Sequence, residues 1–164
     1  VHAARRNIGL LTLCFNNSIY GMTGGQVAPT TPRGVKTKTT PFGNLEYPLD
    51  LCSLAETAGA SYVARWTSAH PRQLTKSIEK AFDKKGFSFI EAVTQCPTYY
   101  GRYSLETTRP SEILRLFLRN SVSVERSKKL SPEELAGKIT IGEFVDIQKL
   151  ELAEQYRIQS NALN

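Results

Sequence analysis

The apolar run of residues 8–15 does most to limit the folds that this chain can adopt. It has the length of a strand and is almost unbroken, which is typical of a parallel strand that is buried on both faces. The run ends abruptly at Asn16 and Asn17, and a glycine-containing loop follows. Ligands of open parallel sheets bind at the carboxyl ends of strands, where loops and helix N-termini meet. We therefore expect this loop to form part of a binding site.

Two further segments with strand character, 61–66 and 87–93, alternate with helical patterns. One helix is expected to open at Pro48-Leu49-Asp50 and to end at Gly59, and another to cover residues 72–84 after a turn at His70. The order strand, helix, strand, helix, strand implies right-handed crossovers. The sequence thus predicts an α/β fold with a parallel sheet flanked by helices, and residues 139–145 predict one more short strand.

The loop after the first strand carries groups suited to a metal and an anion. The amide oxygen of Asn17 is a hard, neutral ligand of the kind that Mg²⁺ accepts, and the backbone carbonyl of Ile19 can turn toward the same ion. The loop also has small or hydrogen-bonding residues that suit an anionic ligand, namely Thr23, Gly24, Gly25 and Gln26. On these residues alone, a plain turn stays open as the alternative.

Composition limits the classes of function. The chain has 164 residues, of which 40% are apolar and 22% charged, as in one ordinary globular domain. The formal charge of +6 admits an acidic protein, a phosphorylated ligand or nucleic acid, but zinc-finger spacing, an RNA-binding aromatic signature and long basic runs are missing, so nucleic acid is not expected. The chain has no run near the ~20 apolar residues of a membrane span. Three cysteines without a CxxC motif indicate a reducing compartment, the cytoplasm.

Residues 17–31 closely resemble the thiamine-pyrophosphate-binding part of the β subunit of 2-oxoacid:ferredoxin oxidoreductases. His2-Ala3-Ala4-Arg5-Arg6-Asn7 and Cys96-Pro97-Thr98 also look like that family. The resemblance implies a partial thiamin-diphosphate-binding fold in which Asn17 and the Ile19 carbonyl are Mg²⁺ ligands. It further implies that the following loop lies against the diphosphate and thiazolium of the cofactor. This loop consists of Tyr20, Gly21, Met22, Thr23, Gly24, Gly25 and Gln26.

Two parts of the family's pattern are missing. Its other metal ligand is an aspartate in an upstream Gly-Asp-Gly motif, which this sequence lacks. The resemblance also makes Cys96 the last of four ligands to a 4Fe-4S cluster, but Cys14 and Cys52 do not align with the other three. By itself, a cysteine before proline is often structural. We expect the chain to be the C-terminal portion of a longer subunit, with both cofactor sites incomplete.

The activity that the resemblance implies is the oxidative decarboxylation of a 2-oxoacid, with electrons passed through the cluster to ferredoxin and the acyl group passed to coenzyme A. The glutamate that activates the cofactor is expected on a partner α subunit, so no catalytic residue is assigned here. Residues 20–26 and 96–102 look most like the 2-oxoglutarate enzymes, in which Arg33 or Arg102 would pair with the distal carboxylate. Three alternatives stay open: a pyruvate or branched-chain substrate, a non-oxidative thiamine-dependent decarboxylase, and a binding or scaffold fragment without activity.

We predict that residues 1–120 are the C-terminal part of the cofactor-binding domain and that residues 121–164 are an extension that packs on the domain or on a partner subunit. Residues 33–40 are expected to form a long surface loop that folds over the cofactor or faces another subunit, with a disordered connector as the alternative. Further helices are expected to start at Pro110 and near Pro132. The tail from 150 to 164 is expected on the surface or on a partner.

Overall fold

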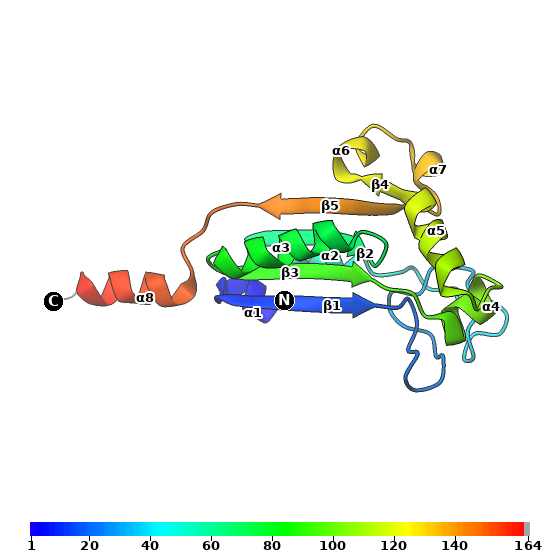
Figure 1. The fold of residues 1–164 in the computed structure, drawn as a ribbon. Coiled ribbons are helices and arrows are strands. Elements are labelled where there is room, and N and C mark those ends of the chain that lie inside the picture. Colours follow the sequence, from blue (N-terminus) through cyan, green and yellow to red (C-terminus); the bar gives the residue numbers. More distant parts are fainter. Residues whose placement is uncertain (163–164) are drawn as a thin grey trace.

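The computed structural model describes residues 1–162 and contains one five-stranded sheet with the strand order β1-β3-β2-β5-β4. The strands are β1 Leu10–Asn16, β2 Tyr62–Thr67, β3 Phe87–Val93, β4 Ser121–Ser123 and β5 Ile139–Asp146. β1, β3 and β2 run parallel, which confirms the prediction for these three, whereas β5 runs antiparallel to β2 and pairs with β4 in parallel. The carboxyl ends of the three parallel strands therefore meet at one edge (Figure 1).

Helices cover both faces of the sheet and both of its ends. They are α1 His2–Arg6, α2 Leu51–Thr57, α3 Pro71–Asp83, the π-helical turn η1 Pro97–Gly101, α4 Arg102–Ser104, α5 Pro110–Asn120, α6 Val124–Ser127, α7 Pro132–Leu135 and α8 Leu152–Asn161. Figure 1 shows α5, α6 and α7 at the end where the parallel strands finish, and α8 beyond the opposite end. The loop 17–50 lies at the first of these ends, so the candidate binding residues share this end with the α5–α7 segment.

Side chains that alternate along the strands form two core layers, because successive residues of a strand point to opposite faces. On one face, α3 contributes Ala81 to a cluster with Tyr62, Ala64 and Ile90. On the other face, a second cluster consists of Ala4 of α1, Cys52 and Ala55 of α2, and Ala60, Val63 and Phe87. The sheet is thus the middle layer of an α/β sandwich, as the alternating pattern predicted.

The expectation that the first strand is buried on both faces is wrong. β1 pairs only with β3 among the described residues and therefore lies at an edge of the sheet. Leu11 and Leu13 pack against the core under α3, but Leu10 is 48% and Phe15 65% exposed. An unbroken apolar run identifies a strand, but the position of the strand in the sheet decides how much of it is covered.

The helix ends follow the capping residues in the sequence. Asp50 caps α2 by accepting a hydrogen bond from the Ser53 backbone N–H at 3.0 Å, and Gly59, at φ 91°, turns the chain after the helix. His70 lies in the turn before α3, as expected, and Pro71 is the first residue of that helix. Ser131 and its partner Glu134 form a capping box at α7. The predicted helix starts are confirmed.

The segment 17–50 contains no helix or strand, only an isolated bridge between Tyr20 and Gln26. Its buried polar residues are nevertheless paired: the Asn44 side-chain amide donates to the Thr31 carbonyl at 2.9 Å. The Lys38 backbone N–H donates to the Gly25 carbonyl at 2.9 Å. The bond from Lys38 holds residues 33–40 against the candidate binding loop, which argues against the alternative of a disordered connector.

The C-terminal part of the described chain adds β4 and β5 to the sheet and then leaves it in α8. No residue of α8 is buried, so this part of the tail lies on the surface as expected, while Leu163 and Asn164 lie outside the described residues. A domain boundary at residue 120 stays a prediction. Within residues 1–162, the helices are too short or too polar to cross a membrane.

Ion pairs fasten β5 to α3, which gives a prediction for stability. Asp146 accepts from Lys80 at 2.6 Å and from Lys84 at 2.5 Å, and these hydrogen bonds hold the pKa of the carboxyl below its ordinary value. A carboxyl whose pKa is lowered by folding stabilises the protein above its unfolded pKa of about 3.9, and this contribution is lost as the pH falls through the lowered value. We expect Asp146→Asn to reduce the free energy of unfolding at pH 7 by up to about 1 kcal/mol, because the pairs are partly exposed.

The check is denaturant unfolding of the unaltered and Asp146→Asn proteins along a series of pH values from 7 down into acid. The difference between the two is expected to shrink toward zero at the acid end. A difference that does not change with pH would show that packing, and not the ion pairs, underlies the effect of the substitution.

Candidate cofactor site

The loop after β1 folds back on itself at the carboxyl edge of the sheet. The Tyr20 N–H donates to the Gln26 carbonyl at 3.1 Å, and the Gly25 N–H donates to the Tyr20 carbonyl at 2.8 Å. This turn needs glycine at two positions, since Gly24 has φ 117° and Gly25 has φ 92°. An added Cβ at Gly25 would also lie 2.7 Å from the Tyr99 ring. The glycines therefore serve a close approach of the loop to η1.

A pocket of about 470 Å³ lies beside this loop. Its lining consists of Cys14, Phe15, Asn16, Asn17, Ile19, Tyr20, Gly21, Met22, Thr23, Ala28, Pro29, Thr30, Leu49 and Leu51. Six of the predicted site residues thus share one pocket, and Gly24, Gly25 and Gln26 complete the turn next to it. The lining contains no aspartate or glutamate, so an anionic ligand meets no carboxylate there.

The two predicted Mg²⁺ ligands lie on either side of a left-handed residue. Ser18 has φ 58°, which reverses the chain between Asn17 and Ile19. The Asn17 amide oxygen accepts a hydrogen bond from the Thr94 hydroxyl at the end of β3. The Ile19 side chain is buried, while its carbonyl accepts no hydrogen bond from the residues that the structure describes. Two neutral oxygens are therefore available to a cation, which fits Mg²⁺ bound together with a phosphate-bearing ligand.

The hydrogen-bonding side chains of the turn are partly used within it. The Thr23 hydroxyl donates to the Gln26 amide oxygen at 2.7 Å, and the Gln26 amide nitrogen donates to the Thr23 carbonyl at 2.9 Å. Met22 is fully exposed, and a Cβ added at Gly24 would meet nothing within 4 Å. The tip of the turn is thus an open surface held in one shape by its own side chains.

Cys96 lies against this loop at the carboxyl edge of the sheet, because it follows the end of β3. A Cβ added at Gly21 would lie 3.2 Å from the Cys96 sulfur. η1 follows directly, and burial raises the pKa of Tyr100 although the Ser18 side chain partly offsets the effect. The end of β3 therefore reaches the Asn17 loop at three places: Thr94, Cys96 and Tyr100.

The other two cysteines have different surroundings. Cys52 is fully buried in the core, where burial raises the pKa of its thiol far above the ordinary value. Cys14 lines the pocket, and burial together with the nearby Glu91 carboxylate raises its pKa too. Both thiols stay protonated at neutral pH, and residues 1–162 hold no group of three or more histidine, cysteine, aspartate or glutamate side chains arranged for a metal ion. Cys96 can thus supply one thiolate, not the four that a cubane cluster needs.

The two predicted substrate arginines are not part of this pocket. Arg33 is exposed and stacks over the Tyr47 ring, with 4.8 Å between its guanidinium carbon and the ring centroid. Arg102 is exposed in α4. Neither lines the pocket next to Asn17, so their role with a substrate stays a prediction.

A buried polar network behind the loop was missed by the sequence analysis. Glu91, in the middle of β3, is 2% exposed and accepts hydrogen bonds from Arg65 and Asn16. A single charged residue inside a largely apolar strand was the available signal, because a buried carboxylate requires partners.

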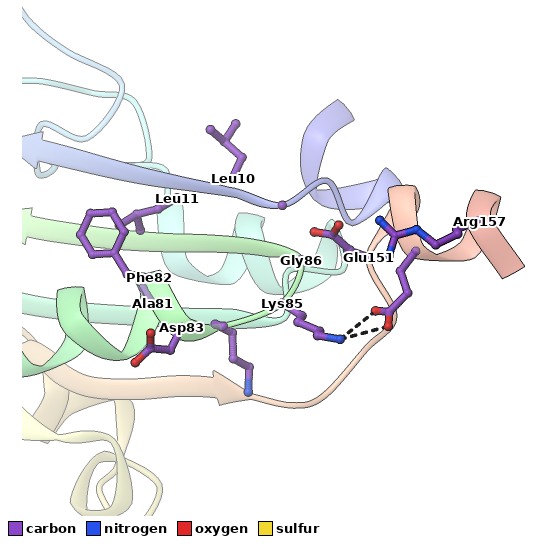
Figure 2. A pocket seen from close by; sticks show the side chains of 12 residues that line it. Leu10, Leu11, Ala81, Phe82, Asp83, Lys85, Gly86, Glu151 and Arg157 are labelled. Atoms are coloured by element: carbon purple, nitrogen blue, oxygen red, sulfur yellow. Dashed lines mark hydrogen bonds and ion pairs between the residues drawn. The ribbon is translucent and has the colours of Figure 1, made fainter.

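A larger pocket of about 680 Å³ lies at the opposite end of the sheet (Figure 2). Leu10 of β1 and Phe82 of α3 line one part of it, and Arg157 of α8 lines another. Its Lys85 pairs with Glu154 at 3.0 Å. This pocket lies at the amino ends of β1 and β3, away from Asn17 and Cys96, so it is not the candidate site.

Comparison with known proteins shows the family of the chain. Residues 1–92 match the family described as "Thiamine pyrophosphate enzyme, C-terminal TPP binding domain". The chain therefore belongs to the thiamine pyrophosphate enzymes, and the matched residues include β1, the loop 17–50 and almost all of β3.

Among individual proteins, the chain is similar to 2-oxoglutarate synthase subunit KorB of Methanocaldococcus jannaschii, with 54% identity over 155 residues that cover 94% of this chain and 57% of that protein. It is also similar to 2-oxoglutarate oxidoreductase subunit KorB of Mycobacterium tuberculosis, with 40% identity over 99 residues, 60% of this chain and 26% of that protein. The chain spans about half the length of the first of these relatives.

The fold is also found in a solved structure of 2-oxoglutarate:ferredoxin oxidoreductase from Magnetococcus marinus, described with 2-oxoglutarate, coenzyme A and succinyl-CoA bound. The TM-score is 0.80 at 24% identity, over 99% of this chain and 55% of that one. At this identity the likeness concerns the fold alone.

Proposed function

We propose that this chain forms the diphosphate end of the thiamine pyrophosphate site in the β subunit of a 2-oxoacid:ferredoxin oxidoreductase. The observation that carries the proposal is the meeting of the Asn17 loop with Cys96 at the carboxyl edge of the parallel strands. The family match over residues 1–92 and the names of the relatives support it. Asn17 lies at the start of this loop, and Cys96 follows the end of β3.

In this proposal, the Asn17 amide oxygen and the Ile19 carbonyl hold Mg²⁺ on the cofactor's diphosphate. The turn 20–26 then shapes the wall of the pocket, with its glycines allowing the backbone to approach the ligand. When bound, the cofactor supplies the nucleophile for the keto carbon of the substrate, and the residues of this chain hold and orient it. A pocket wall without carboxylates suits the anionic diphosphate.

Cys96 is proposed as one ligand of a 4Fe-4S cluster next to the cofactor. Its half-buried sulfur lies at Gly21, beside the proposed diphosphate loop. The described residues do not provide the remaining ligands, so no electron-transfer step is derived from this chain.

The proposed substrates are 2-oxoglutarate and coenzyme A, and the proposed partners are an α subunit and ferredoxin, in the cytoplasm. The relatives named as 2-oxoglutarate synthase subunits favour 2-oxoglutarate over pyruvate or a branched-chain 2-oxoacid. Arg33 and Arg102 remain candidates for its distal carboxylate. Residues 1–120 are proposed as the cofactor-binding part and residues 121–164 as an extension toward a partner.

The experiment uses the intact complex, with this chain in its full-length subunit, purified anaerobically. We expect iron and sulfide to be present, and ferredoxin reduction to require thiamine pyrophosphate, coenzyme A and 2-oxoglutarate. Faster turnover of pyruvate or 2-oxoisovalerate than of 2-oxoglutarate would overturn the proposal that 2-oxoglutarate is the substrate. Cofactor binding with decarboxylation but without iron would identify the non-oxidative decarboxylase instead.

Cys96→Ser in the intact complex tests the cluster ligand. We expect a loss of iron and sulfide and a fall of ferredoxin reduction to background, because a serine hydroxyl replaces the thiolate with little change in size. The matched control for iron and sulfide content is Cys14→Ser, which alters another half-buried cysteine, and both contents are expected to stay unchanged in it. Unchanged iron content in Cys96→Ser would show that Cys96 is a structural residue.

A further inference from the structure

Glu91 is a buried carboxylate with three neighbours. Its Oε2 accepts from the Arg65 Nε at 2.6 Å and lies 3.6 Å from the Cys52 sulfur, while its Oε1 accepts from the Asn16 Nδ2 at 2.6 Å. The strands β1, β3 and β2 bring Asn16, Glu91 and Arg65 together, since Glu91 stands opposite Arg65 in the strand register. Cys52 belongs to α2. A charge in this position is unfavourable without partners, so Arg65 and Asn16 are required to keep it there.

The bond to Glu91 fixes the orientation of the Asn16 amide. Because a carboxylate only accepts hydrogen bonds, the Nδ2 of Asn16 must face Glu91 and its Oδ1 must face away. This oxygen accepts from the Ser18 N–H at 2.8 Å and from the Thr30 hydroxyl at 2.8 Å. One amide therefore joins the start of the loop, at Ser18, to its return, at Thr30.

Ser18 is the residue between the two proposed Mg²⁺ ligands. Its φ of 58° is a conformation that residues with a side chain adopt only with support from their surroundings. The hydrogen bond from its N–H to Asn16 is such support, and Ser18 is the residue that joins Asn17 to Ile19.

The same network reaches the far end of the segment 17–50. The Arg65 Nη2 donates to the Asp50 Oδ1 at 2.7 Å, and this carboxylate also caps α2. Burial alone would raise the pKa of Asp50, but the Arg65 charge and the Ser53 N–H outweigh it, so the net pKa is lowered and Asp50 stays ionised. Glu91 and its partners thus hold both ends of the loop 17–50 in place.

We propose that Glu91 is a positioning residue for the cofactor site: through Asn16 it holds Ser18 in the conformation that aims the Asn17 and Ile19 oxygens at one Mg²⁺-diphosphate. The inference rests on the proposed function. Glu91 does not touch the ligand in this arrangement, because Asn16 lines the candidate pocket and Glu91 does not.

The test exchanges the donor and the acceptor of the hydrogen bond between Asn16 and Glu91. In Glu91→Gln, the oxygen of the new side-chain amide faces Arg65, so its nitrogen opposes the amide nitrogen of Asn16. Asn16 must turn, and the Ser18 N–H then loses its acceptor. We expect the affinity of the apo complex for thiamine pyrophosphate with Mg²⁺, measured by calorimetric titration, to fall by about tenfold to 100-fold. Asn16→Asp is expected to show a similar loss, because it places two carboxylates side by side.

The affinity of the double variant Glu91→Gln with Asn16→Asp decides whether Glu91 acts through Asn16. The amide nitrogen introduced on β3 can now donate to the carboxylate introduced on β1, which again accepts from Ser18 and Thr30, and the total charge of the network is restored. Asn16 lines the candidate pocket, so the introduced aspartate also weakens binding of the diphosphate directly, and the matched comparison is with Asn16→Asp, which carries the same charge. We expect the double variant to bind at least about tenfold more tightly than Asn16→Asp, because only the double variant restores the hydrogen bond across the strands. A double variant as weak as Asn16→Asp would overturn the proposal.

Thermal unfolding without cofactor is the second readout. The single variants disturb a buried network, so lower unfolding midpoints are expected for them, and the titrations are made at a temperature at which every variant is folded. Asn16→Ala, which leaves the Glu91–Arg65 pair intact, replaces Glu91→Gln if the latter does not fold, and the same loss of affinity is expected. If the unaltered complex does not bind thiamine pyrophosphate, the proposed function fails. If it binds and all variants bind equally well, only the positioning role of Glu91 fails.

Discussion

Replacing Asn17 by leucine is expected to lower the affinity for thiamine pyrophosphate with Mg²⁺ by about 100-fold or more. Leucine has nearly the shape of asparagine but no oxygen that could bind the metal. Mutation of residues that only orient metal ligands already lowers metal affinity by about 10- to 100-fold, so loss of a ligand is expected to cost at least as much. The substitution also removes the acceptor of the Thr94 hydroxyl, which is only part-buried and can bond to water instead. The loss should therefore appear in cofactor binding and not in the folding of the chain.

The measurement is calorimetric titration of the apo complex with thiamine pyrophosphate at fixed Mg²⁺, together with thermal unfolding in the absence of both. Asn161→Leu is the matched control, since it makes the same exchange at an exposed position of α8. An unchanged affinity in Asn17→Leu would show that the metal is held elsewhere and would remove the basis of the proposed site.

Replacing Gly86 by alanine is expected to destabilise the fold by about 3 kcal/mol or more. Gly86 has φ 87°, where a Cβ is strained by about 1–2 kcal/mol, and an added Cβ would collide with the buried Asn7 side chain. Asn7 accepts from the Ser61 hydroxyl at 2.8 Å and from the Phe87 N–H at 3.0 Å. Each hydrogen bond is worth about 1 kcal/mol, so displacing Asn7 adds to the conformational strain.

Denaturant unfolding of the subunit gives the free energies, and Gly34→Ala separates the two effects. Gly34 has φ 81°, but an added Cβ there meets nothing within 4 Å, so only the strain of about 1–2 kcal/mol is expected. Equal losses in the two variants would mean that Asn7 contributes little to stability.

The order of elements could be predicted because it depends on local patterns. The third strand was placed at its observed bounds, Phe87–Val93, and the capping residues Asp50, Gly59 and Pro71 marked helix ends. The rule that parallel strands finish at one edge also accounts for the place of Cys96 beside the Asn17 loop, because each follows one of these strands. The burial of the first strand was predicted wrongly because it depends on the neighbours that the sheet order supplies.

The partners of the buried polar side chains could not be predicted, for a related reason. Glu91 pairs with Arg65 on one neighbouring strand and with Asn16 on the other, and only the register of all three strands shows that these residues meet. The loop 17–50 likewise depends on side-chain bonds such as that from Asn44 to Thr31, which follow no periodic pattern. Non-periodic hydrogen bonds of this kind leave no signal in a single sequence.

The hydrogen bond from the Asn7 amide to the Leu150 carbonyl joins residues 143 positions apart at 2.9 Å. The Leu152 N–H donates back to the Asn7 carbonyl at 3.1 Å, so the contact is made twice. During synthesis these bonds can form only after residues 150–152 have left the ribosome, whereas the partners of Asn7 at Ser61 and Phe87 emerge much earlier. Closure of this end of the sheet is thus a late step in folding, and such distant contacts are slow to form because the intervening chain must first be ordered.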